Sequence, residues 1–164
     1  MENHNDWYKD VVKEIDKHKD TFSKRGYKKY KLDLLLRMAK RVASFSADCG
    51  ECQNFQGEIT KLAKDLGNLV QASKEERKSY FKMINSILKH LQKHHELITE
   101  GENVAIWIGI GIAIGSGMSI VFGVGSDNSG MGMPIGAGIG IGIAIGSAIG
   151  GYLDAKAKKE GRVI

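Results

Sequence analysis

Apolar residues dominate the last third of the chain and divide it into two long runs. From Val104 to Leu153 the single charged residue is Asp127. A short polar patch at 126–130 separates a first apolar run at 104–125 from a second at 131–153. Each run is long enough for a helix that crosses a hydrocarbon core of roughly 30 Å. The pattern therefore predicts a transmembrane helical hairpin over 104–153.

Glycine recurs in both runs at a spacing that suits the packing of helices. Of the 21 glycines, 16 lie after residue 103. Small residues at every fourth position let helix backbones approach closely, and in lipid such packing replaces the hydrophobic driving force. A second small-residue row, at Ala105, Gly109, Ala113 and Gly117, gives the first run another packing face. The expected helix-packing residues are Gly111, Gly115 and Gly123, in one row with Ser119, and Gly138, Gly142, Gly146 and Gly150.

A β-hairpin is the alternative for this region. Isoleucine alternates with glycine or alanine at 108–115 and over much of 135–146, and a period of two is the signal of a strand. Hairpins from many copies of the chain would then close a large barrel. However, each run is about twice the 9–11 residues of a spanning strand, and the inward face would be glycine rather than polar. We therefore expect helices.

The first 103 residues carry the apolar stripes of amphipathic helices. Apolar positions step by three and four, and Ser73 with Glu76 forms a capping box that opens the last helix. Four helices joined by short turns predict an antiparallel bundle. The predicted fold is thus all-α: a cytoplasmic antiparallel helical bundle at 1–103, a glycine-zipper transmembrane hairpin at 104–153, and a basic tail at 154–164. The four stripes are Trp7, Val11, Ile15 and Phe22; Leu34, Leu35, Met38, Val42 and Phe45; Phe55, Ile59, Leu62, Leu66 and Leu69; and Phe81, Ile84, Leu88, Leu91, His95 and Ile98.

The net charge of +5 is distributed unevenly about the two apolar runs. Lysine and arginine lie before the first run and after the second, whereas the loop at 126–130 has neither. Positive residues mark the cytoplasmic side of membrane proteins, so we expect both termini in the cytoplasm of a cell with this protein in its inner membrane. Trp107 and Tyr152 then fall at the membrane interface. The polar start of the chain predicts no signal peptide, and no nucleic-acid partner is expected.

Cys49 and Cys52 form a C-x-x-C motif that favours a metal site. A thioredoxin-like pair needs a βαβ setting, and haem attachment needs a histidine where Gln53 stands. If 53–70 and 74–100 form a helical hairpin, residue 50 faces a residue near 95, which brings the cysteines to a histidine cluster. We predict a structural zinc held by Cys49, Cys52 and two of His90, His94 and His95. The spacing favours His90 with His94 and the apolar stripe favours His95, so the pair stays open. Two reduced thiols beside solvated histidines are the alternative.

Catalytic signatures are missing from the sequence. It holds no Ser-His-Asp candidate, no phosphate-binding loop ending in Gly-Lys-Ser/Thr, and no paired carboxylates in an apolar setting. We therefore expect a protein that is not an enzyme.

The hairpin region resembles the small prokaryotic glycine-zipper membrane proteins, through Gly111 and Gly115, the row from Gly138 to Gly150, and the repeat at 141–146. This resemblance covers the C-terminal third alone and implies close-packed helices and homo-oligomers, in several cases channels or toxins. Two small-residue rows on a span also allow each helix to contact two neighbours. We expect a homo-oligomeric pore or channel, with a non-conducting membrane scaffold and a lytic bacteriocin-like effector as alternatives. The polar pore lining would come from Ser116, Ser119 and Ser147.

Overall fold

The computed structural model describes residues 2–124 and 135–164, and every named element within them is helical. The described residues form two compact units, one of residues 1–97 with Ile164 and one of residues 98–163. The all-α class is confirmed for these residues, and both apolar runs form helices where they are described. The β-hairpin alternative is therefore excluded over the described parts of the two runs.

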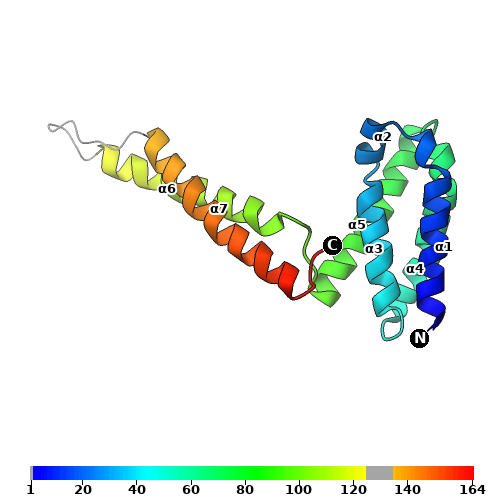
Figure 1. Cartoon of the computed structure of the whole chain (residues 1–164). Coiled ribbons are helices and arrows are strands. Elements are labelled where there is room, and N and C mark those ends of the chain that lie inside the picture. The colour runs from blue at the N-terminus through cyan, green and yellow to red at the C-terminus, as the bar shows by residue number, and fades with distance from the viewer. Residues whose placement is uncertain (1, 125–134) are drawn as a thin grey trace. The chain divides into compact units, whose positions relative to one another are not determined.

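The first unit is a helical bundle built from four long helices and two short ones (Figure 1). The long helices α1, α3, α4 and α5 share one hydrophobic core. The elements are α1 (Glu2–Lys17), the 3₁₀ turn η1 (Lys19–Thr21), α2 (Lys24–Lys29), α3 (Leu32–Phe45), α4 (Gly50–Leu69) and α5 (Lys74–His95).

The core of this bundle uses the apolar stripes at helical spacing. Leu35, Met38 and Val42 of α3 and Ile59 and Leu66 of α4 are fully buried. Each such side chain contributes about 1.5–3 kcal/mol through removal from water. On α5 the buried positions are Tyr80, Ile84, Ile87, His90 and Leu91, so the buried stripe is turned by one residue from Phe81 and Leu88, which are half-buried.

Helix boundaries follow local capping chemistry. The capping box is confirmed: the Ser73 hydroxyl accepts a hydrogen bond from the Glu76 N–H at 3.2 Å, and the Glu76 carboxylate accepts one from the Ser73 N–H at 2.7 Å. The first predicted helix is shorter than its stripe, because α1 ends at Lys17 and Phe22 lies beyond it. Ser23 accepts from the Gly26 N–H at 3.1 Å and so starts the separate helix α2.

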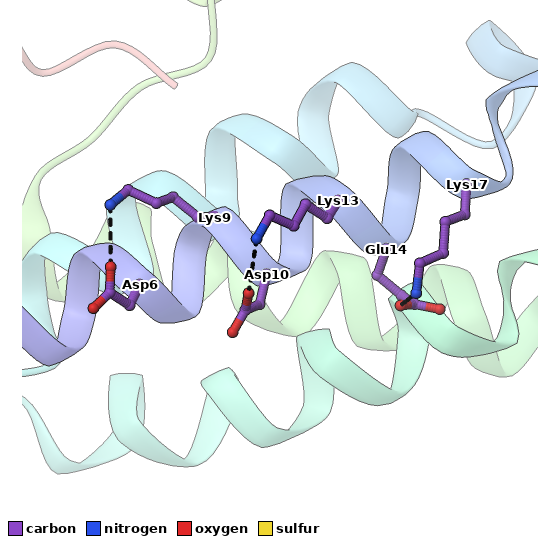
Figure 2. A network of polar contacts seen from close by, with 6 residues as sticks. All are labelled: Asp6, Lys9, Asp10, Lys13, Glu14 and Lys17. Carbon is purple, nitrogen blue, oxygen red and sulfur yellow. Dashed lines mark hydrogen bonds and ion pairs between the residues drawn. The ribbon is translucent and has the colours of Figure 1, made fainter.

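The solvent face of α1 carries three ion pairs at a spacing of three residues, which Figure 2 shows. They join Asp6 to Lys9, Asp10 to Lys13, and Glu14 to Lys17 at 3.1, 3.7 and 2.6 Å. The hydrogen bond from Lys17 lowers the pKa of Glu14. Exposed pairs of this kind add little stability, and they mark this face of α1 as hydrated.

The second unit consists of α6 (Glu102–Val124) and α7 (Ile135–Lys159), which pack along each other (Figure 1). Near its ends an isolated bridge joins Ile98 to Val163, with a hydrogen bond of 2.9 Å from the Ile98 N–H to the Arg162 carbonyl. The predicted loop at 126–130 lies outside the described residues.

Candidate functional site

Two cysteines and two histidines of the first unit converge at one point. The Nε2 atom of His90 lies 3.4 Å from Cys49 Sγ and 3.5 Å from Cys52 Sγ, and the Nε2 atom of His95 lies 3.3 Å from Cys52 Sγ. All four donor atoms lie within 4.8 Å of one another. Zinc–sulfur and zinc–nitrogen bonds in a tetrahedron place sulfur and nitrogen about 3.5 Å apart. These four residues are therefore positioned to bind a metal ion, with spacings that suit zinc.

The start of α4 places both sulfurs on one side. Cys49 is the N-cap of the helix, and its sulfur accepts from the Cys52 N–H at 3.5 Å. Cys52 follows after one helical turn and is fully buried, so the two sulfurs face the same space. Gly50 between them has nothing within 4 Å of the position of a Cβ atom. The C-x-x-C motif at the N-terminus of α4 thus offers two sulfur ligands to one ion.

The end of α5 supplies the two histidines. One of them, His90, was favoured by the C-x-x-C…H-x3-H spacing, and the other, His95, by the apolar stripe. His90 is buried and His95 is half-buried, whereas His94 is exposed and does not belong to this donor set. The Phe45 ring stacks on His95 with centroids 3.9 Å apart, and the Phe55 ring meets His90 edge-on at 5.4 Å. These aromatic neighbours hold both imidazoles toward the sulfurs.

Burial shifts the pKa of two of these groups, and the shift at Cys52 does not suit a redox pair. Burial, more than the neighbouring Cys49 and Glu51, raises the pKa of the Cys52 thiol to about 12. A thiol of this kind is unreactive at neutral pH, unlike the thiolate of a disulfide oxidoreductase. Burial, followed by the charges of His90 and His94, lowers the pKa of His95 and favours its neutral, metal-binding form. A metal ion must displace the Cys52 proton when it binds.

Four protein donors close the coordination shell of a tetrahedral ion. No position is left for a water or substrate, so such a centre is structural and not catalytic. Its mechanical effect is a link between the start of α4 and the end of α5, which are far apart in sequence. Because an unfolded chain holds no preformed site, the metal-binding free energy adds to the stability of the bundle.

The contact between α6 and α7 is the second candidate site, and glycine forms it. A Cβ atom added at Gly111 would lie less than 3.0 Å from the carbonyl of Gly142, and one at Gly115 would lie as close to the carbonyl of Gly138. Gly146 approaches the backbone of Trp107, and Gly150 that of Val104, equally closely. We call these six glycines, Gly111, Gly115, Gly138, Gly142, Gly146 and Gly150, the glycine seam. Gly123 lies outside the residues whose surroundings are described.

Large apolar side chains of this unit are exposed on its surface. Val121, Ile114 and Ile145 are 71%, 58% and 56% exposed. Two helical segments, Glu102–Val121 and Gly136–Lys159, are long and apolar enough to cross a membrane. The second small-residue row is open at Gly109 and Gly117 on α6, which have nothing within 4 Å of a Cβ position. Gly136 and Gly140 on α7, which the sequence analysis did not single out, are open in the same way.

The remaining predicted residues of the hairpin differ in exposure. Ser119 is buried beside Gly138, and its hydroxyl donates to the Gly115 carbonyl at 2.9 Å. The hydroxyls of Ser116 and Ser147 donate to carbonyls of their own helices, those of Ala113 and Ala144, at 3.0 and 2.9 Å. Trp107 is half-buried and Tyr152 is 70% exposed.

Asp154 is a residue that the sequence analysis placed in the basic tail and gave no role. Its two carboxylate oxygens accept from the backbone N–H groups of Asn103 and Val104, at 3.2 and 3.3 Å. It therefore caps the N-terminus of α6 from the end of α7, where a negative charge is favoured. The signal available in the sequence was a lone acidic residue at the boundary of an apolar run.

Comparison of the chain with protein-family models, curated proteins and solved structures found no match.

Proposed function

We propose that the protein is a two-span integral membrane protein of the inner, cytoplasmic membrane, whose soluble bundle is stabilised by a structural zinc ion. One observation carries the membrane assignment: α6 and α7 place glycine against glycine inside their contact and large aliphatic side chains outside. The apolar core helix of a soluble protein is mostly buried, whereas these two candidate spans are 11% and 22% buried. Such a surface is stable in lipid and would aggregate in water.

The topology that we propose has both termini in the cytoplasm. It is supported by the lysines before α6 and by Lys156, Lys158 and Lys159 in the last turn of α7. Asp154 adds support, because it holds the start of α6 and the end of α7 at one level.

Single cysteines at position 126 and at the exposed position of Lys159 are expected to differ in reaction with an impermeant thiol reagent added to intact cells. In a background with Cys49 and Cys52 replaced by serine, Ser126→Cys should react in intact cells. Lys159→Cys should react only after the cells are permeabilised. Reaction of Lys159→Cys in intact cells, with none of Ser126→Cys, would contradict the topology.

We further propose that copies of the hairpin assemble. The glycine seam is occupied within one chain, whereas Gly109, Gly117, Gly136 and Gly140 are open to another helix. Since small-residue rows drive helix association in lipid, these open rows support a homo-oligomer. A ring of such hairpins is the pore that we propose, with Ser116 and Ser147 as its polar lining. Because Ser119 is buried beside Gly138, we leave it out of the lining that we propose.

A non-conducting scaffold is the second candidate, and it is favoured by the serine hydroxyls, which already donate within their own helices. Ion flux through purified protein in liposomes distinguishes the two. A pore predicts that flux falls strongly in Ser116→Leu and Ser147→Leu. Each substitution removes a polar group from the lumen, and an apolar lumen loses its water. Ile120→Leu, also exposed on α6, is the matched control and should conduct normally. An oligomer of wild-type size without flux would support the scaffold instead.

A further inference from the structure

A second group of donor atoms lies on the outer side of the His90 ring. Glu51, His90 and His94 offer one carboxylate oxygen and two imidazole nitrogens, all within 4.8 Å of one another. Glu51 and His94 are exposed, whereas the donor set of the metal centre is buried or half-buried. We call these three residues the outer triad. His90 belongs to both groups, so its ring separates an outer position from the buried one.

The inner and outer faces of His90 correspond to its two ring nitrogens. Nε2 faces Cys49 and Cys52, while Nδ1 lies 2.9 Å from Glu51 Oε2. That short approach lacks hydrogen-bond geometry, and Nδ1 is the one buried side-chain nitrogen or oxygen of the described residues without a hydrogen-bond partner. The His90 side chain is 5% exposed. A buried nitrogen without a hydrogen bond costs free energy, and the carboxylate oxygen 2.9 Å away supplies the second donor of a place that a cation can fill.

We propose that the outer triad is an acquisition site, at which a divalent cation such as Zn²⁺ is captured before it enters the buried centre. This inference rests on the metal centre proposed above. A neutral imidazole has one lone pair, so His90 serves the outer and the inner position in turn and not at the same time.

The transfer is balanced in protons. In the capture step, Glu51, His94 and the Nδ1 lone pair of His90 hold the ion, and the ring proton is on Nε2. In the final state Nε2 has lost its proton to solvent and binds the ion together with His95 and the two thiolates. Nδ1, which has released the ion, has taken up a proton from solvent and faces Glu51. The two thiol protons leave to solvent. The carboxylate thereby changes from ligand to the outer partner that orients a metal-bound histidine.

His94 and Glu51 are accessible to solvent, as this role requires. Both are exposed, and the His94 ring stacks on that of His90 with centroids 4.8 Å apart. Exposed side chains change rotamer in picoseconds to nanoseconds, which is far faster than the exchange of a buried metal. Cys52, by contrast, is fully buried, so an ion reaches its thiol only after it has met exposed or half-buried donors such as Glu51, His94 and Cys49.

Cobalt exchange tests the proposal in the full-length protein. The chain is stripped with a chelator, Co²⁺ is added, and the sulfur-to-cobalt absorption band reports entry into the buried centre. A site on the exchange path changes loading and release equally and leaves the equilibrium alone. We therefore expect His94→Gln to slow both loading and chelator-driven release about tenfold, with the cobalt content unchanged. His18→Gln, the same change in a histidine that lies directly after α1, is the matched control and should exchange at the wild-type rate.

Glu51→Gln should slow both rates as well and should also weaken cobalt binding, because it removes the partner of His90 in the final state. Glu58→Gln on the same helix is its control. Wild-type exchange rates in His94→Gln would overturn the acquisition site while the metal centre stands. Loss of bound cobalt at equilibrium in His94→Gln would also overturn it and would make His94 a permanent ligand. An unmodified chain that binds no cobalt would overturn both proposals.

Discussion

Replacement of Cys52 by serine is expected to release the metal that we propose and to lower the melting temperature of the helical bundle. The Cys52 sulfur is fully buried and lies within 3.5 Å of both His90 and His95, so the substitution removes a central donor of the set. At a free zinc concentration a hundredfold above the dissociation constant, the lost stabilisation is about 2.7 kcal/mol. For a bundle of this size that corresponds to a decrease of roughly 10–20 °C. The measurements are the zinc content of purified protein and thermal unfolding followed by circular dichroism.

Two comparisons make this result specific to the metal. A chelator should lower the melting temperature of the unmodified chain toward that of Cys52→Ser and should leave the variant unchanged. His95→Gln should also lose the metal, whereas His94→Gln, the same substitution at the neighbouring position, should retain it at equilibrium. If chelator treatment leaves the unmodified protein as stable as before, the cysteines and histidines are ordinary core residues.

The position of the candidate metal centre could be predicted from sequence because one short connection joins the two helices that supply its donors. A short connection at Ser73 fixes the pairing of α4 with α5, and this pairing brings residues near 50 and 95 together. The choice among the histidines could not be predicted, since it depends on the end of α5. Glu96 has a left-handed conformation there, with φ of 52°, and Phe45 from α3 covers His95. Neither feature can be predicted from the spacing of apolar residues along the chain.

The helical class of the apolar runs was likewise predictable, because length and glycine spacing both favoured helices. The helix that each glycine row contacts could not be predicted. The rows at 111–115 and 138–150 are equally suited to contacts within one hairpin and between copies, because small residues specify closeness and not identity. The structure uses these rows within one chain, in the glycine seam, and leaves the row at Gly109 and Gly117 open. The capping role of Asp154 could not be predicted, because it depends on the position of backbone N–H groups of another helix.

The second strong prediction concerns Gly142, in the glycine seam. Substitution by leucine should separate α6 from α7, because the new Cβ atom would lie less than 3.0 Å from the backbone carbonyl of Gly111, which cannot turn aside. Overpacking in a rigid contact costs about 1–3 kcal/mol even for smaller additions. Gly140→Leu is the matched control, two residues away on the same helix, where a Cβ atom meets nothing within 4 Å. The first variant should lose the hairpin and the second should keep it.

The measurement is the midpoint of unfolding by sodium dodecyl sulfate in mild detergent, followed through the fluorescence of Trp107 in a Trp7→Phe background. Trp107 is a suitable reporter because its carbonyl contacts Gly146 within the seam. A fall in the midpoint for Gly142→Leu and not for Gly140→Leu places the row inside the hairpin. Particle size gives the complementary result: Gly140 belongs to the open surface, so Gly140→Leu should disperse an oligomer while the hairpin stays closed. If instead Gly142→Leu disperses the particle at an unchanged midpoint, the row joins neighbouring copies, and the contact between α6 and α7 is not the one that holds the hairpin together.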